Sequence, residues 1–232
     1  MNINKRDKLI AGVDEAGRGS VIGPLVVAGI GVKESKLRLV RSLNLRDSKT
    51  LTRTSRRRLF SKIVGIADYI CLCVLSTNEI DESVRLKGLN KLEAEAMAAV
   101  ISDIQPDNVY VDCCDVKPLR YTSLLETHIT SGRVYQLYSF HHADALNAVV
   151  SAASIIAKVI RDSEIYEIRK THNNIGSGYP SDKLTINFIK DWVLRFGEAP
   201  AFVRKSWRPV KLILKESAGI SLDQLDQFCT RS

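Results

Sequence analysis

The sequence lacks any long apolar run. A helix that crosses a bilayer needs about 18 or more mostly apolar residues, and no stretch of the 232 residues approaches that length. The N-terminal segment MNINKRDKLIAGVDE carries charges but no long apolar core, so we expect no signal peptide. These absences argue against a membrane-spanning or secreted protein and favour a cytoplasmic location.

The cysteines lack the spacing of a zinc site. There are five of them, none in a C-x-x-C pair: Cys71, Cys73, Cys113, Cys114 and Cys229. An odd number of cysteines without a secretion signal favours reduced thiols. Internal repeats and low-complexity tracts are also missing. With 45% hydrophobic and 26% charged residues, the composition is that of an ordinary globular protein.

Acidic residues are in the minority. The chain has 26 Asp and Glu against 34 Lys and Arg, which gives a net charge of +8. A basic balance favours polyanionic partners such as nucleic acid. Charge alone leaves simple solubility open as an explanation.

Five short segments are rich in strand-forming residues. They are residues 9–13, 21–32, 69–76, 109–112 and 134–140. Helical patterning is expected at 55–66, at 92–104 and over 145–171, and the spacing of Asn90 and Glu93 fits a capping box for the second helix. The early strands fit a meander and the later ones crossover units. The expected fold class is therefore α/β, with a mixed five-stranded sheet flanked by helices.

Four acids stand at or just beyond the expected strand ends: Asp14, Glu15, Asp112 and Asp144. Functional sites gather at strand ends in open α/β sheets. Clustered carboxylates suit hard cations such as Mg²⁺ and Mn²⁺. Two such ions, about 3.5–4 Å apart, can activate water and stabilise the leaving oxygen in phosphodiester cleavage.

The adjacent acids Asp14 and Glu15 raise a geometric problem, because neighbouring residues on a strand point to opposite faces. We expect the strand to end or bend near Asp14, so that both carboxylates reach one side. The segment Gly17-Arg18-Gly19 follows directly. Its glycines allow such a bend and bring backbone N–H groups close to a ligand, while the arginine can grip a phosphate.

Seven short motifs occur in order along the chain between about residues 9 and 209: VDEAGRG, IGPLVVAG, RDSKTLT, YVDCCDV, HHAD, SAASIIAKVIRD and GSGYPSD. Together they resemble ribonuclease HII, a type 2 ribonuclease H, and the late VRKSW is most similar to its archaeal branch. The resemblance implies a ribonuclease H-like catalytic domain (1–172), a C-terminal helical region that contributes to substrate binding (173–217) and a flexible tail (218–232).

The resemblance also implies an activity. It is the hydrolysis of the RNA strand in RNA–DNA hybrids and cleavage on the 5′ side of single ribonucleotides in duplex DNA, leaving 3′-OH and 5′-phosphate ends. The implied role is ribonucleotide removal in replication and repair. Two alternatives stay open: a non-catalytic hybrid-binding protein on the same fold, and a nuclease of another specificity.

Individual roles follow by position. The resemblance makes Asp14, Glu15, Asp112 and Asp144 the catalytic, metal-binding acids for Mg²⁺ or Mn²⁺, with two ions in the reacting complex. The backbone of Gly17, Arg18 and Gly19 is implied to recognise the 2′-OH, the group that distinguishes RNA from DNA. Tyr179 is implied to stack on the following sugar. A loop with Arg46, Ser48 and Lys49 suits phosphate contact.

Some positions depart from the family pattern. Ser20 stands where proline is common, Thr50 where a second lysine is common, and His142 where lysine usually stands. These departures concern substrate affinity more than catalysis, since all four acids are present.

Other polar and aromatic residues are weaker candidates. Asp115 could support the metal ligands from behind, whereas Asp162 is expected to be a surface or packing acid. His141 and His142 could assist proton transfer or contact phosphate, but we favour the interpretation in which one packs and the other is solvated. The run Arg56-Arg57-Arg58 is expected to lie on a solvated surface. Packing anchors are expected at Trp192 and Trp207.

The C-terminal tail contains a degenerate sliding-clamp motif. Leu222, Leu225 and Phe228 have its spacing, although the usual glutamine and second aromatic residue are missing. A plain disordered tail is the alternative. We otherwise expect a monomer whose partners are RNA–DNA hybrid and ribonucleotide-containing duplex DNA.

Overall fold

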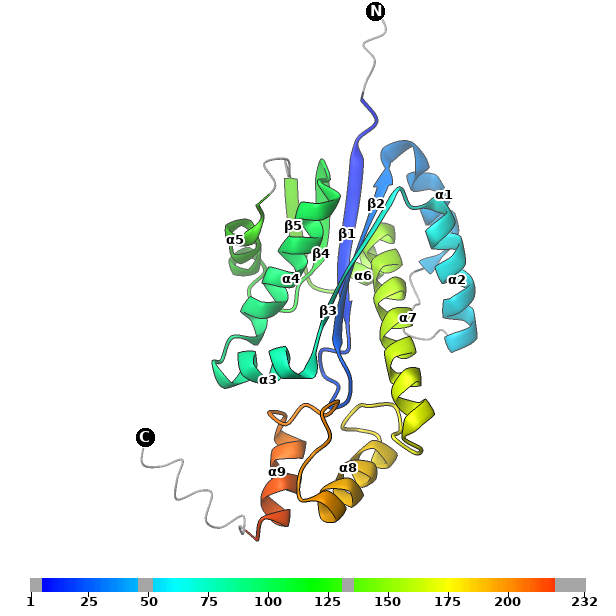
Figure 1. The fold of residues 1–232 in the computed structure, drawn as a ribbon. Coiled ribbons are helices and arrows are strands. Elements are labelled where there is room, and N and C mark those ends of the chain that lie inside the picture. The colour runs from blue at the N-terminus through cyan, green and yellow to red at the C-terminus, as the bar shows by residue number, and fades with distance from the viewer. Residues whose placement is uncertain (1–5, 46–51, 131–135, 220–232) are drawn as a thin grey trace, which may run out of the picture. The chain divides into compact units, whose positions relative to one another are not determined.

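The structure is a computed structural model that describes residues 6–45, 52–130 and 136–219. Its elements follow one another along the chain as shown in Figure 1. The chain divides into two compact units, which are described separately. The first unit contains Met1–Ala16, Leu25–Leu75 and Gly88–Asp162. The second contains Gly17–Pro24, Ser76–Lys87 and Ser163–Ser232.

A mixed five-stranded sheet forms the centre of the first unit. Its strands are β1 (Leu9–Ala16), β2 (Leu25–Lys33), β3 (Tyr69–Leu75), β4 (Asn108–Asp112) and β5 (Gln136–Phe140), in the spatial order β3-β2-β1-β4-β5. The first three strands pair antiparallel, and β4 and β5 add in parallel. The expected meander, crossovers and mixed sheet are therefore confirmed.

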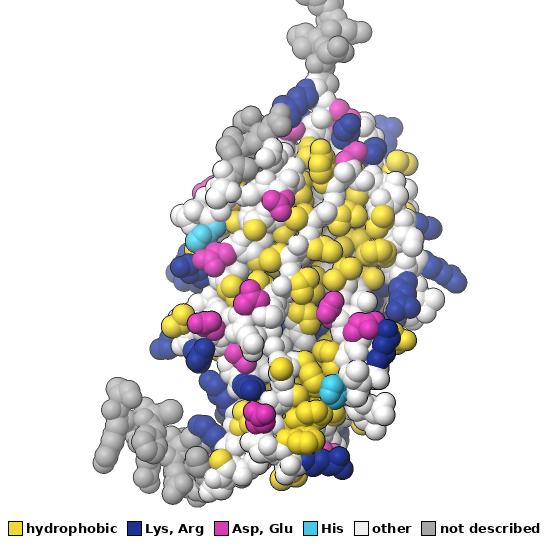
Figure 2. Space-filling view, in the orientation of Figure 1, with side chains coloured by type: hydrophobic (Ala, Val, Ile, Leu, Met, Phe, Trp, Pro, Cys, Tyr) yellow, Lys and Arg dark blue, Asp and Glu magenta, His cyan; other side chains and the backbone are white. Residues whose placement is uncertain are grey.

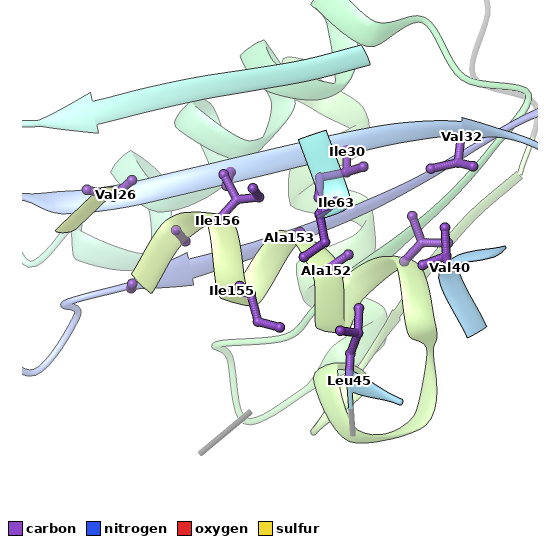
Figure 3. Close-up of a cluster of buried hydrophobic side chains, with 14 of the residues drawn as sticks. Val26, Ile30, Val32, Val40, Leu45, Ile63, Ala152, Ala153, Ile155 and Ile156 are labelled. Carbon is purple, nitrogen blue, oxygen red and sulfur yellow. The ribbon is translucent and has the colours of Figure 1, made fainter. Parts of the chain in front are cut away.

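Helix α7 (Ala148–Thr171) covers one face of this sheet. Figure 3 shows side chains of β2, such as Val26 and Ile30, packed against Ala153 and Ile156 of α7. The helix comes so close to β1 that a Cβ built on Gly12 would lie 2.5 Å from the backbone nitrogen of Val150. The even-numbered residues of β1 and β2 thus face α7.

The opposite face is covered by α4 (Leu89–Ile104), which packs against β1, β2 and β3. Here a Cβ on Gly29 would collide with the Val100 and Ile104 side chains. Helix α5 (Pro118–His128) packs against α4 and β5. The remaining elements of the unit are the 3₁₀ turn η1 (Glu34–Lys36), α1 (Leu37–Ser42), α2 (Arg53–Ile66) and α6 (Ala143–Leu146).

Two expectations about helix starts are wrong. Helix α4 begins at Leu89 after Gly88, and no capping box forms at Asn90, whose amide donates to Asp115 Oδ2 instead. The expected single helix over 145–171 is interrupted at Asn147, because its extended backbone separates α6 from α7. Asn147 Oδ1 accepts a hydrogen bond from the N–H of Val149 in the first turn of α7.

The second unit is built mainly from helices. They are α3 (Thr77–Arg85), α8 (Lys183–Phe196) and α9 (Arg208–Ser217), together with the C-terminal part of α7. Its core includes Ile22, Ile165, Ile189, Val203 and Val210. The segment 17–24 belongs to this unit, where Ile22 pairs with Val203 as an isolated bridge.

The surface of the protein carries charges of both signs (Figure 2). Figure 2 shows Lys and Arg side chains interspersed with Asp and Glu on the face in view, around a field of apolar side chains. Among the described residues, none of the helices combines the length and apolarity that a bilayer crossing requires.

Candidate active site

Two of the predicted acids stand at the same edge of the sheet. The parallel pairing of β1 with β4 runs to Val13 and Val111, and Asp14 and Asp112 are the next residues of the two strands. Parallel neighbours in register point the same way. The arrangement β1–β4 therefore brings Asp14 and Asp112 together, as the sequence predicted for acids at strand ends.

Asp14 is buried among both charges and hydroxyls. Burial raises its pKa to about 7, and the neighbouring Asp112 carboxylate also raises it, while Ser154 and Lys158 of α7 lower it. A carboxyl in such a place loses its proton readily only when a cation is near. Asp14 is therefore suited to hold a cation at neutral pH.

Glu15 completes a cluster of three carboxyls with Asp14 and Asp112, here called the acidic cluster. Burial raises the pKa of Glu15 well above its usual range, and the charges of Glu93, Asp14 and Asp112 raise it further. Its backbone N–H donates to Asp14 Oδ1 at 2.7 Å. Its side-chain Oε2 is buried without a hydrogen-bond partner.

The expected end or bend of the strand at Asp14 is wrong. The β1–β2 ladder continues without a bulge through Asp14, Glu15 and Ala16. Accordingly, Asp14 is next to residues of α7, whereas Glu15 is next to Glu93 of α4. The charge of Asp14 nevertheless raises the pKa of Glu15.

Backbone hydrogen bonds hold the segment that contains Asp144 near the end of β4. It is buried on α6, and the Ser151 hydroxyl donates to its carbonyl oxygen. Ala143, the preceding residue, donates its N–H to Asp112 Oδ1 at 2.9 Å. The start of α6 is thus fixed against the end of β4.

The donor chemistry fits a hard divalent cation. Oxygen ligands are what Mg²⁺ and Mn²⁺ prefer, and an unpartnered buried carboxylate oxygen such as Glu15 Oε2 needs a positive neighbour. Within 6–45, 52–130 and 136–219, however, no three His, Cys, Asp or Glu side chains already lie close enough to hold one ion together. The shared four-acid site therefore stays a prediction.

The Gly17-Arg18-Gly19 segment forms a tight turn in the second unit. Gly17 has a positive φ of 90°, and its carbonyl accepts hydrogen bonds from the Ser20 N–H (3.2 Å) and hydroxyl (2.9 Å). Ser20, which departs from the family pattern, thus closes the turn. A Cβ built on Gly19 would meet nothing within 4 Å, so the backbone there is open to an approaching ligand.

The loop with Tyr179 is tied to that turn. The carbonyl of Gly178 accepts hydrogen bonds from the N–H groups of Val21 (2.8 Å) and Ile22 (3.1 Å). Gly178 in turn donates its N–H to the buried Thr185 hydroxyl. Two segments predicted to touch substrate, far apart in sequence, are therefore held side by side in one unit.

The rival acids have structural partners. Backbone and side-chain hydrogen bonds from Lys117, Arg120 and Asn90 engage Asp115, and the Lys117 N–H is the largest cause of its lowered pKa. Asp162 forms an ion pair with Arg56 at 3.2 Å, which confirms it as a packing acid. The solvated surface expected for the run Arg56-Arg57-Arg58 is confirmed for Arg57 and Arg58, which are exposed, but not for Arg56, whose side chain is only 20% exposed.

The histidines and tryptophans have local contacts. His141 Nδ1 lies 3.3 Å from the carbonyl of Cys113, and His142 adopts a left-handed backbone before α6. Trp192 packs among His172 and other aromatic side chains. The ring of Trp207 lies under the guanidinium of Arg204. Both tryptophans are thus packing residues, as expected.

Several predicted residues lie outside the described ranges. They are the phosphate-loop residues Arg46, Ser48 and Lys49, the departure at Thr50, and the tail residues Leu222, Leu225 and Phe228. Sequence reasoning missed Glu93 and Arg204 as neighbours of predicted site residues. The motif VRKSW contains Arg204 and could have drawn attention to it.

Comparisons with known proteins identify the family of this chain. The family model for ribonuclease HII matches residues 11–210. A ribonuclease HII of Cenarchaeum symbiosum is 46% identical over 88% of this chain and 98% of its own length. The crystal structure of ribonuclease H2 from Pyrococcus horikoshii has a TM-score of 0.84 at 39% identity, covering 90% of this chain and 99% of that one.

A second solved structure, a PCNA:RNase HII complex from Archaeoglobus fulgidus, has a TM-score of 0.79 at 37% identity. It covers 86% of this chain and 95% of that chain. These similarities extend over nearly the whole chain and confirm the ribonuclease H-like fold. The chain belongs to the ribonuclease HII family, and it is a divalent-metal-dependent endoribonuclease that hydrolyses the RNA of RNA–DNA hybrids.

Proposed function

We propose that Asp14, Glu15, Asp112 and Asp144 hold the cations of this reaction at the ends of β1 and β4. The observation that carries the proposal is the acidic cluster, in which burial and the charge of Asp112 raise the pKa of both acids, Asp14 and Glu15. Bound Mg²⁺ or Mn²⁺ would supply an activated water and neutralise charge at the phosphate. Because a cation favours ionised carboxylates, its binding would release protons from Asp14 and Glu15.

The other acids of the set have orienting contacts. The Ala143 N–H donates to one oxygen of Asp112 and so orients its carboxylate. Ser151 fixes the backbone of Asp144. Such preset side chains lower the cost of ordering ligands when the ion binds.

We also assign recognition of the ribonucleotide to the second unit. The open backbone at Gly19 and its neighbours Gly17 and Arg18 would contact the 2′-OH, and Tyr179 would stack on the adjoining sugar. Arg46, Ser48 and Lys49 would contact phosphate. The enzyme would then cut on the 5′ side of single ribonucleotides embedded in duplex DNA.

A cleavage assay tests both parts of this proposal. Asp112→Asn should lower the cleavage rate of a duplex with one embedded ribonucleotide at least ~100-fold in excess Mg²⁺, because a metal ligand is lost. Asp191→Asn, an exposed acid on α8, should keep the wild-type rate. Near-normal cutting by Asp112→Asn would contradict the metal assignment, and equal cutting of an all-DNA duplex by the wild type would contradict 2′-OH recognition.

A sliding clamp is a further proposed partner. The tail residues Leu222, Leu225 and Phe228 have the spacing of a clamp-binding peptide. The A. fulgidus relative was solved as a PCNA complex, which supports the proposal. Clamp binding by the full chain but not by a chain ending at Gly219 would test it. The monomeric state, the cytoplasmic location and the division into 1–172, 173–217 and 218–232 stay predictions.

A further inference from the structure

Arg204 is a fully buried arginine in the second unit. Burying a guanidinium is costly unless its N–H groups find acceptors. Nothing in the reaction described above uses this residue. Its contacts therefore need an explanation of their own.

The side chain of Arg204 donates to both ends of the segment that carries Gly17-Arg18-Gly19. Its Nη1 donates to the carbonyl of Arg18 at 3.0 Å, and its Nε donates to the carbonyl of Gly23 at 3.0 Å. Between these two, the Arg204 backbone N–H donates to the carbonyl of Val21 at 2.9 Å. One residue thus binds three carbonyls within six positions of the chain.

The bound segment depends on outside contacts for its shape. It belongs to no sheet ladder, and it turns at Gly17 (φ 90°) and Gly23 (φ 82°). Backbone groups of such a loop need hydrogen-bond partners when they are buried. Gly178 supplies the acceptor for the N–H groups of Val21 and Ile22, and Arg204 supplies donors for the carbonyls.

An arginine suits this position better than a lysine. The guanidinium has five donors in a rigid planar fork, so that two of them can reach separate carbonyls at once. The ammonium of a lysine is a more compact, strongly hydrated charge and could not donate to both separate carbonyls in the same way. The ring of Trp207, whose centroid is 5.0 Å from the guanidinium carbon, packs against the guanidinium in a cation–π contact.

The chain on the other side of Arg204 is also anchored. Asp81 of α3 accepts hydrogen bonds from the N–H groups of Lys205 (2.7 Å) and Ser206 (2.9 Å). All these residues belong to the second unit. The backbone that carries Arg204 is therefore also held by contacts outside the segment that Arg204 binds.

We infer that Arg204 is a positioning residue for ribonucleotide recognition, which sets the backbone of Gly17-Arg18-Gly19 in the form that contacts the 2′-OH. The inference rests on the proposed role of that backbone. Arg204 itself touches no substrate in this account. Its loss should reduce discrimination between ribose and deoxyribose, beyond any loss of stability.

The test compares the affinities of two duplexes that differ by one 2′-OH. Binding is measured by fluorescence anisotropy in Ca²⁺, without Mg²⁺ or Mn²⁺, with intact duplex verified afterwards. The wild type should prefer the one-ribonucleotide duplex about tenfold, as expected for one or two hydrogen bonds. Arg204→Lys should bring this ratio close to one and speed hydrogen–deuterium exchange in the peptide 17–24.

Val193→Ala provides a control matched for stability. Val193 is buried in the same core but makes no hydrogen bond to the segment through its side chain. This variant should unfold more easily yet keep the wild-type ratio and the slow exchange of 17–24. If Arg204→Lys does not fold, Trp207→Leu, which frees the guanidinium from its ring, carries the same test.

Each outcome decides between the inference and its premise. A folded Arg204→Lys protein with the wild-type ratio and wild-type exchange would overturn the positioning role. A wild type that binds both duplexes equally would instead contradict 2′-OH recognition, while exchange in 17–24 would still report whether Arg204 holds the segment. A ratio lost equally in Val193→Ala would show a general effect of stability and also overturn the inference.

Discussion

The buried carboxyl of Asp14 makes the stability of the folded chain depend on pH. Its pKa is about 7 in the folded chain, against an ordinary value of 3.8, mainly because of burial. Below about pH 4 both states carry the proton and the folded state loses nothing. As the pH rises toward 7, the unfolded state ionises first and gains relative to the folded one. The metal-free protein should therefore lose up to a few kcal/mol of stability over this range.

Urea unfolding in EDTA at several pH values between 4 and 8 would measure the loss. Asp14→Asn should make this part of the stability profile less steep, since an amide does not titrate, while Glu15, whose pKa is also raised, should account for the slope that remains. Asp191→Asn should retain the wild-type profile. Saturating Mg²⁺ should restore stability above pH 7, because it binds the ionised form. An unchanged profile in Asp14→Asn would show that its carboxyl ionises normally in the folded chain.

At this scale the sequence predicted the acids better than their neighbours. Asp112 could be predicted because the end of β4 is visible as an apolar run closing on an acid. The same pattern drew attention to Asp14, although β1 continues beyond it to Ala16. Glu93 was assigned to a capping box, whereas it is buried beside Glu15. Its environment depends on how α4 packs against β1, and local spacing contains no information about that contact.

At the scale of elements, Gly12 allows β1 and α7 to approach closely. A Cβ at this position would press against the backbone of α7, which cannot move aside as a side chain could. Gly12→Ala should therefore lower the free energy of unfolding by about 3 kcal/mol, as overpacking does. Gly65→Ala is the matched control, since a Cβ on Gly65 of α2 meets nothing within 4 Å. It should be neutral or stabilise by up to about 1 kcal/mol.

Thermal and urea unfolding of the two glycine variants, measured side by side, would separate these effects. The contrast matters more than either value, because both substitutions reduce the freedom of the unfolded chain similarly. If Gly12→Ala were as stable as Gly65→Ala, the close approach of α7 to β1 would be wrong.

Element types could be predicted from pattern, but element boundaries depended on caps. The strands and the long helices were visible in apolar periodicity and composition. Helix α3 was missed, although Ser76 and Glu79 have capping-box spacing and form that box in the structure. The break at Asn147 was missed because the apolar spacing continues across it. The extended backbone of Asn147 ends α6, and its side chain accepts a hydrogen bond from the first turn of α7.

At the scale of the whole molecule, the antiparallel and parallel pairing of the strands could be predicted, whereas the place of residues 17–24 and 76–87 in the second unit could not. Early strands in close succession favour a meander, and helices between later strands favour parallel crossovers. The second unit also takes in residues 17–24 and 76–87. Contacts such as that from the Thr77 hydroxyl to the carbonyl of Ala201 join residues far apart in sequence. Local sequence patterns do not predict such long-range contacts.

The net charge of +8 is also a property of the whole molecule, and it attracts nucleic acid as a polyanion. Binding of a basic protein to nucleic acid releases counterions, so affinity falls as salt rises. The affinity of Asp112→Asn for an RNA–DNA hybrid should fall at least about tenfold between 50 and 200 mM NaCl, as expected for a few phosphate contacts. Anisotropy titrations of this cleavage-deficient variant would measure the slope.

The same titrations with an all-DNA duplex separate charge from recognition. Both duplexes present similar phosphates, so their salt slopes should be nearly equal. The difference in affinity should then persist at every salt concentration, since a hydrogen bond to the 2′-OH releases no counterion. A flat salt response would mean that the excess Lys and Arg, interspersed with acids on the face in Figure 2, serve solubility and not binding. If the preference for the hybrid disappeared at high salt, the preference would be electrostatic. That result would contradict recognition of the 2′-OH.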